Sequence, residues 1–143
     1  MNILAIDSSG DQTSVCVMLD GDVISFSSKH ERKDRPNWNN LLLNIGHKKI
    51  FQLDDIDLFA YANSETSYTA TRSVATYLKA VSVALDKPLI AVLAEEHEGA
   101  HADKIAMAAK QQFENSGFNA KAFDPDDANP VYAIDTHYKK INE

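Results

Sequence analysis

Cysteine is nearly absent from this sequence: Cys16 is the only one among 143 residues. A single cysteine cannot form an internal disulfide, so a reducing cytoplasm fits this composition, and stability must come from a hydrophobic core. At this length the chain is expected to form one domain and to bury roughly two-thirds of its unfolded surface. Cys16 itself lies within a predicted strand, where we expect a small apolar filler and no nucleophile.

Long apolar runs are also missing. None approaches the ~20 residues that a membrane helix needs. The sequence passes from Met1-Asn2 directly into a strand-like run, without the basic start and apolar core of a signal peptide. We therefore expect a cytoplasmic protein with no membrane segment.

Positive charge is scarce, and the formal net charge is −7. The only basic cluster spans residues 29–35 and is interrupted by Glu31 and Asp34. A nucleic-acid binder normally carries a continuous basic patch that exchanges counterions with phosphates. Direct binding of nucleic acid by this chain is therefore not expected.

Three strands are predicted at the beginning of the chain. Residues 3–6 form a short apolar run that ends at the turn signal Asp7-Ser8-Ser9-Gly10. Residues 13–19 alternate, and residues 23–26 follow after Asp20-Gly21, a strong hairpin signal. At least two of these strands should be antiparallel.

Helical and strand patterns alternate in the rest of the chain. An amphipathic helix closed by Gly46 is predicted first, with apolar residues at i, i+3, i+4 and i+7: Trp38, Leu41, Leu42 and Ile45. Next we expect a strand at 56–62, a helix at 71–85, a strand at 89–92 and a helix from 95 to about 115 that stops at Gly117. The order βββ-α-β-α-β-α predicts an α/β fold, a mixed sheet with helices on its faces. This order resembles the ribonuclease-H-like half-fold of actin-like ATPases.

Three stretches carry a more specific resemblance. Ile3-Leu4-Ala5-Ile6-Asp7-Ser8-Ser9 is similar to the motif ILAIDTS, and residues 56–72 are similar to IDALAFGRGPGSFTGVRIG, with a gap-free alignment as far as Pro88. Pro130-Val131-Tyr132, with Lys139-Lys140, is similar to PVYLRN…WKK. All three motifs are those of the TsaB (YeaZ) family. On this resemblance, residues 1–117 match the family's ribonuclease-H-like first lobe. Residues 118–143 form an acidic loop and a tail like the family's end, and the second lobe is missing.

The resemblance implies a scaffold without catalytic residues or a cofactor. Family members bind a TsaD-type ATPase and, with a TsaE-type ATPase, support threonylcarbamoyl transfer to adenosine in certain tRNAs. Their first two helices form the pairing surface, either with TsaD or with a second copy as a homodimer. The corresponding residues here are Trp38, Leu41, Leu42, Ile45, Thr71, Val74, Tyr77, Leu78 and Val81. The alternatives are that these stripes belong to the core, or that the chain is a diverged homodimer that no longer binds TsaD.

The chain departs from the family at six glycine positions. They are occupied by Ala62, Ser64, Thr66, Ala70, Val74 and Thr76, whereas Ser67, Thr69 and Arg72 match the family pattern. Glycine is used where the backbone must approach a ligand or adopt positive φ. The loop after residue 62 is therefore not expected to hold a ligand closely.

Two short motifs suggest enzymatic alternatives. Asp7, Ser8 and Ser9 occupy the position of the first phosphate loop of actin-like ATPases, where ATP or ADP would bind. We expect a vestigial turn instead, because a single lobe has no cleft to close over a nucleotide.

His97-Glu98-Gly99-Ala100-His101 fits H-E-x-x-H, in which two histidines on one helix hold zinc and the glutamate acts as a base. A small metal-dependent hydrolase is the function that this motif would imply. Acidic neighbours and Gly99 favour a solvated first helical turn, so we predict no metal site.

Overall fold

The computed structural model describes residues 1–9, 11–31, 37–63, 68–93 and 100–125. A sheet of five strands is its framework: β1 (Ile3–Ser8), β2 (Gln12–Leu19), β3 (Asp22–Lys29), β4 (Leu58–Asn63) and β5 (Leu89–Leu93). The spatial order is β3-β2-β1-β4-β5. β2 pairs antiparallel with β1 and β3, and β4 pairs parallel with β1 and β5. The predicted mixed sheet is confirmed.

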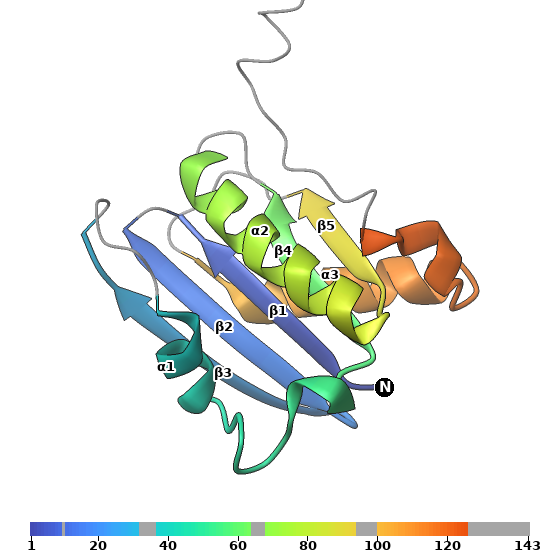
Figure 1. Ribbon diagram of the computed structural model, residues 1–143, viewed down its shortest axis with the longest axis horizontal. Coiled ribbons are helices and arrows are strands. Elements are labelled where there is room, and N and C mark those ends of the chain that lie inside the picture. The colour runs from blue at the N-terminus through green and yellow to red at the C-terminus, as the bar shows by residue number, and fades with distance from the viewer. Residues whose placement is uncertain (10, 32–36, 64–67, 94–99, 126–143) are drawn as a thin grey trace, which may run out of the picture.

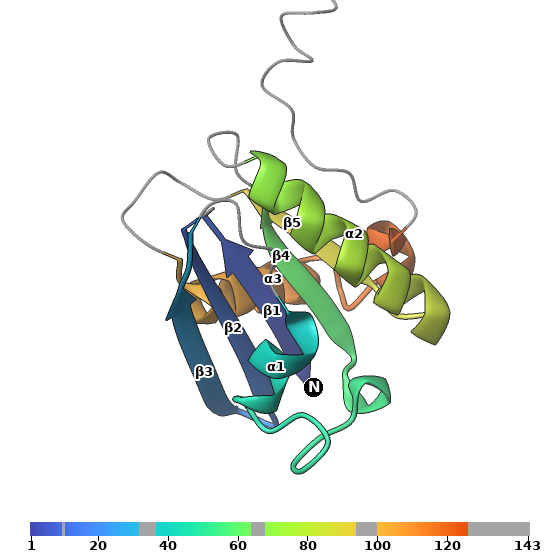
Figure 2. The same cartoon turned by 60° about the vertical axis from the view of Figure 1, so that its left-hand side comes forward.

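Three α-helices cover this sheet. α1 (Trp38–Leu43) and α2 (Tyr68–Leu85) lie on one face, and α3 (Ala102–Asn115) lies on the other (Figures 1 and 2). Two short 3-10 helices, η1 (Leu53–Asp55) and η2 (Ala120–Phe123), were not predicted. The order βββ-α-β-α-β-α is otherwise confirmed.

The β2–β3 hairpin forms where Asp20-Gly21 predicted it. Both turn residues have positive φ, 50° at Asp20 and 96° at Gly21, and Leu19 pairs with Asp22 across the turn. Positive φ at both central residues belongs to the type I′ turn, whose twist suits a two-residue hairpin. The turn thereby sets the register of β3.

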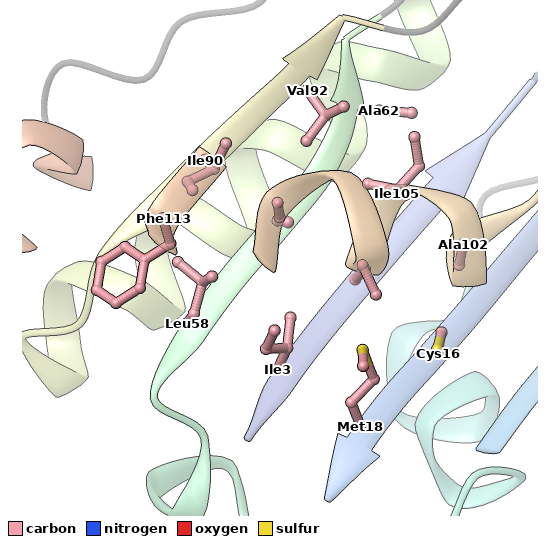
Figure 3. Packing of buried hydrophobic residues seen from close by; sticks show 14 residues of the cluster. Ile3, Cys16, Met18, Leu58, Ala62, Ile90, Val92, Ala102, Ile105 and Phe113 are labelled. Carbon is pink, nitrogen blue, oxygen red and sulfur yellow. The ribbon is translucent and has the colours of Figure 1, made fainter. Parts of the chain in front are cut away.

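The face of the sheet beneath α3 combines small and large buried side chains. Ala5, Ala60 and Cys16 are fully buried there, in the same core cluster as Ala106 and Ala109 of α3. Short side chains on both surfaces let the helix axis approach the sheet closely. Larger side chains fill the margins of this interface, as Figure 3 shows for Met18, Ile90 and Phe113.

The opposite face carries the larger side chains of the same strands. Leu4, Ile6, Phe59 and Tyr61 are fully buried against α1, α2 and the segment that connects α1 to β4. β1 and β4 are therefore buried on both faces, as expected of central strands with near-continuous apolar sequences.

The described chain after α3 folds back onto that helix. Gly117 has a φ of 75° and ends α3 as predicted, and the Phe118 N–H donates to Phe113 O. The Phe113 ring contacts Phe118 edge-on at 5.8 Å and Phe123 at 6.0 Å between centroids. Residues 118–125 thus pack on the domain, while the boundary at residue 117 stays a prediction.

His47, between α1 and η1, is a buried histidine that favours its neutral form. Its side chain is 6% exposed and its ring lies 5.5 Å from that of Phe51. Among the described residues Nδ1 has no hydrogen-bond partner. Burial, and then the charge of Lys48, lowers the His47 pKa below its ordinary value of 6.5.

A pH dependence of stability follows from this lowered pKa. Below pH 6.5 the unfolded chain takes up a proton at His47 that the folded chain resists, so the free energy of unfolding should fall with falling pH. Denaturant titrations between pH 8 and pH 5 will measure this loss, and His47→Phe should reduce its slope. An identical slope in the variant would assign the dependence to other groups.

Candidate functional site

Polar side chains gather where β1 ends and β2 begins. The antiparallel register places Asp7 opposite Ser14 and Ser8 opposite Thr13. All four side chains are buried, with Asp7 7% exposed and Thr13 fully enclosed. The predicted phosphate-loop residues Asp7 and Ser8 therefore belong to a polar cluster within the fold.

This cluster binds the amino end of α3. The Ala100 N–H donates to Gln12 Oε1 at 3.2 Å, the His101 N–H to Asp7 Oδ2 at 2.8 Å, and the Ala102 N–H to Ser14 Oγ at 3.0 Å. The first N–H groups of a helix have no partner within it, and a carboxylate is favoured at its positive end. Asp7, Gln12 and Ser14 together supply this cap. His101, at the N-cap position itself, makes no capping hydrogen bond through its side chain.

Ser8 belongs to a second chain of hydrogen bonds. Its hydroxyl lies 2.8 Å from Thr13 Oγ1, which lies 2.9 Å from His30 Nε2. His30 Nδ1 lies 3.0 Å from Glu31 O. With Nδ1 protonated and donating to that carbonyl, Nε2 accepts from Thr13, and Thr13 accepts from Ser8. This series of hydrogen bonds connects the end of β1 to the residue that follows β3.

Ser9 is engaged in the turn that follows. Its N–H donates to Gln12 O at 2.9 Å, and its hydroxyl donates to the same oxygen at 3.3 Å and lies 3.4 Å from Asp11 Oδ1. A phosphate loop presents such amides and hydroxyls to its ligand. Here they serve the turn, which supports the expectation of a vestigial loop, and the absence of ATP or ADP stays a prediction.

The H-E-x-x-H motif lies mostly outside the described residues, which include neither His97 nor Glu98. The helix predicted from residue 95 is wrong for Ala100 and His101, because α3 begins at Ala102 and His101 has φ −136° and ψ 80°. The bonds to Gln12 and Asp7 hold this stretch outside the helix. Within the described part of the chain, no three His, Cys, Asp or Glu side chains are grouped so as to hold a metal ion.

Five of the predicted interface side chains lie in the monomer's own core. Leu42, Ile45, Thr71, Val74 and Leu78 are at most 1% exposed. Leu42 lies on the inward side of α1, and Thr71, Val74 and Leu78 form the inward stripe of α2, as amphipathic helices usually arrange them. Ile45 follows the end of α1, because this helix stops at Leu43 and not, as predicted, just before Gly46. These side chains cannot themselves contact a partner without repacking of the core.

The other four predicted residues lie at the edge of that core. Trp38, Leu41, Tyr77 and Val81 are partly buried and pack against it. The Trp38 and Tyr77 rings stack with centroids 5.4 Å apart and planes inclined by 20°, so α1 and α2 touch. Burial also raises the pKa of the Tyr77 hydroxyl. Pairing through these helices stays a prediction, to which these four residues could contribute directly.

The outward face of α2 was not identified by the apolar periodicity of the sequence, which marks only the inward stripe. Its exposed residues are Thr69, Arg72, Ser73, Thr76, Ala80, Val83 and Ala84. Arg72 is the only charged residue in this set. The outward face of α3, by contrast, carries Asp103, Lys104 and Glu114. The scarcity of charge among residues 69–85 was the sequence signal for this surface.

Cys16 has no environment suited to nucleophilic chemistry. It is fully buried in the α3 side of the core, and burial, followed by the charge of Asp103, raises its pKa to about 12. A thiol protonated at neutral pH is a poor nucleophile. The interpretation of Cys16 as an apolar filler agrees with this position.

No helix among the described residues is both long enough and apolar enough to cross a membrane.

Sequence comparisons identify no relative: no family model matches the chain, and neither does any curated protein. Solved structures do match. YeaZ from Pseudomonas aeruginosa superimposes with a TM-score of 0.60 and 19% identity over 81% of this chain and 50% of that one. A structure described as an uncharacterized protein with similarity to peptidase YEAZ, from the same organism, gives the same score and identity over 81% and 49%. The chain thus spans about half the length of these proteins and shares the fold of a YeaZ-like, ribonuclease-H-like half.

Proposed function

We propose that this chain is a TsaB-like accessory subunit, without catalytic activity of its own, that pairs with a TsaD-type ATPase in threonylcarbamoyladenosine modification of tRNA. Two independent likenesses support the proposal. The sequence resembles the TsaB family in its opening motif and in residues 56–88, and the fold resembles YeaZ over most of the chain. Fold alone does not define function, so the pairing surface carries the rest of the argument.

The observation that carries the proposal is the outward face of α2. A solvated helix normally places charged and polar residues on its exposed side, as α3 does. Apart from Arg72, the exposed side of α2 is built from small or uncharged residues: Thr69, Ser73, Thr76, Ala80, Val83 and Ala84. Small uncharged side chains lose little conformational entropy and little hydration when a partner covers them. Val83 remains 48% exposed in the isolated chain and adds apolar area to this face.

The stacked Trp38 and Tyr77 extend this surface. Their rings lie between the core and solvent, so a partner could complete their burial. Large aromatic side chains are favoured at the centres of protein contacts. A TsaD-type subunit, which the family resemblance implies to be related in fold, could contribute helices of its own to this surface.

Thr76→Arg tests the pairing. Thr76 is exposed near the middle of α2, and arginine is a good helix former, so the fold should be retained. A charged, bulky side chain within the contact should raise the Kd for the TsaD-type protein of the same organism at least ~10-fold, equivalent to about 1.4 kcal/mol. Titration calorimetry on the purified proteins measures this change.

Gln111→Arg is the matched control, since it places the same side chain on the exposed face of α3. It should bind the TsaD-type protein as the unmodified chain does. Failure of the unmodified chain to form the complex would contradict the proposal and favour the diverged-homodimer alternative. Equal binding by the Thr76→Arg variant and the unmodified chain would remove the outward face of α2 from the contact.

A further inference from the structure

The strand β3 forms one margin of the sheet, with β2 on its inner side (Figures 1 and 2). It is eight residues long and pairs with β2 along its whole length without a bulge. β5, at the other margin, has only five residues and follows Pro88 directly. Short strands and prolines protect sheet edges from further pairing. β3 lacks both protections.

The hairpin register determines which backbone groups β3 presents outward. Leu19 and Asp22 flank a two-residue turn and form a hydrogen-bonded pair, so every second residue from Asp22 bonds to β2. Val23, Ser25, Ser27 and Lys29 therefore direct their N–H and C=O groups to the free edge. In the described part of the chain the N–H groups of Val23, Ser25 and Ser27 have no hydrogen-bond acceptor. Three donors in a row are available to another strand.

The side chains of β3 do not oppose such pairing. Asp22 and Lys29, its first and last residues, are its only charged residues. The six residues between them are Val, Ile, Phe and three Ser, and proline is not among them. Natural edges are commonly blocked by a charge or a proline near the middle of the strand, and β3 has neither.

From this edge we infer that two copies of the chain pair through β3, antiparallel about a two-fold axis, to form one continuous ten-stranded sheet. Opposite charges at the two ends of the strand select a second copy as the partner. Antiparallel pairing brings the end of each strand that carries Asp22 next to the end of the other that carries Lys29, so the charges at each end of the interface are of opposite sign. This surface is separate from the outward face of α2, so the dimer does not depend on the proposed function.

The symmetry restricts the register of the two strands. A two-fold axis normal to the sheet keeps each side chain on its own face, so residues that pair must both have even or both have odd numbers. The register centred on Phe26 pairs Val23 with Lys29 and Ser25 with Ser27, which uses all four outward-directed residues. It also places Phe26 opposite itself, in a pair without mutual hydrogen bonds.

Phe26 suits this central position. It is partly buried and packs against the core beneath α1. In such a pair the two Cα atoms are about 4.5 Å apart, and side chains are closer than in a hydrogen-bonded pair. Contact between the two rings would stabilise the centre of the interface, as aromatic cross-strand pairs do in sheets.

Sedimentation velocity over a concentration series tests the inferred dimer. The unmodified chain should dimerise, and Ser25→Pro should be monomeric or at least ~10-fold weaker, since proline removes an outward N–H that β2 does not use. Ser25→Thr keeps that N–H and should dimerise normally. A monomeric unmodified chain, or a folded Ser25→Pro variant that dimerises equally, would overturn the inference.

Cross-linking tests the register. In a Cys16→Ala background, Phe26→Cys should give a disulfide-linked dimer on mild oxidation, because Cα separations of 4.4–6.8 Å permit the bond. Ile24→Cys is the matched control on the same face of β3. It lies opposite Ser28 in this register, so no linked dimer should form. Efficient linkage through position 24 and none through position 26 would refute the register.

The Thr76→Arg variant separates this dimer from the proposed function. It should lose binding to the TsaD-type protein and keep the β3-mediated dimer. If Thr76→Arg is monomeric while Ser25→Pro stays dimeric, the homodimer forms through the helices, and pairing through β3 is rejected.

Discussion

Replacing Asp7 with alanine should lower the free energy of unfolding by about 2–3 kcal/mol. The carboxylate is buried and accepts the His101 N–H at 2.8 Å. Without it, that N–H at the start of α3 loses its acceptor, at a cost of ~1–3 kcal/mol, and bonds to charged groups are the stronger ones. The favourable interaction with the helix dipole is also lost. Urea unfolding at neutral pH measures the change.

Asp7→Asn is the discriminating companion variant. Its amide oxygen can still accept from His101, so it should lose only the charge contribution and remain more stable than Asp7→Ala. Hydrogen exchange at the His101 and Ala102 amides should accelerate in the alanine variant and much less in the asparagine variant. If Asp7→Ala is as stable as the unmodified chain, the capping role is incorrect, and a ligand-binding role for Asp7 becomes the better interpretation.

Truncating Phe59 to alanine should have the largest effect on stability, about 3–5 kcal/mol. Phe59 is completely buried, with 0% of its surface exposed. It lies on β4, in the core beneath α1 and α2. Its loss removes apolar contacts and leaves a cavity among side chains that are held by strands on both sides. Calorimetric and urea unfolding should both report the loss.

Two comparisons bound this prediction. Phe59→Leu keeps most of the buried volume and should cost much less than the alanine variant. Leu93→Ala removes an apolar side chain that is 73% exposed at the end of β5, and should change stability by no more than about 0.5 kcal/mol. Equal losses for Phe59→Ala and Leu93→Ala would mean that the core has been assigned incorrectly.

The sequence predicted the sheet well because its signals are local. Asp20-Gly21 defines a turn by its own backbone preferences, and the apolar runs of β1 and β4 reflect burial on both faces. The start of α3 was predicted incorrectly because it is decided by tertiary contacts. The acceptors are Asp7, Gln12 and Ser14, far away in the sequence, and no helix propensity near His101 encodes them.

The sequence located only part of the candidate interface, and the reason differs from that for α3. Periodicity identified the apolar stripes of α1 and α2, but a stripe of this kind is the same for a core face and for a contact face. The structure places Leu42, Val74 and Leu78 inside. The outward face of α2 is recognised by its lack of charge relative to α3, and that comparison requires knowing which residues are exposed.

The cap on α3 also has a consequence for synthesis on the ribosome. The acceptors on β1 and β2 precede their N–H donors by 88 to 94 residues. At 5–20 residues per second, the hairpin is complete roughly 5–20 s before α3 can dock. Throughout that interval the face of the sheet that α3 later covers remains exposed, whereas α1 and α2 are made early enough to cover the opposite face first. A slow, late closure of one face is thus built into the order of the chain.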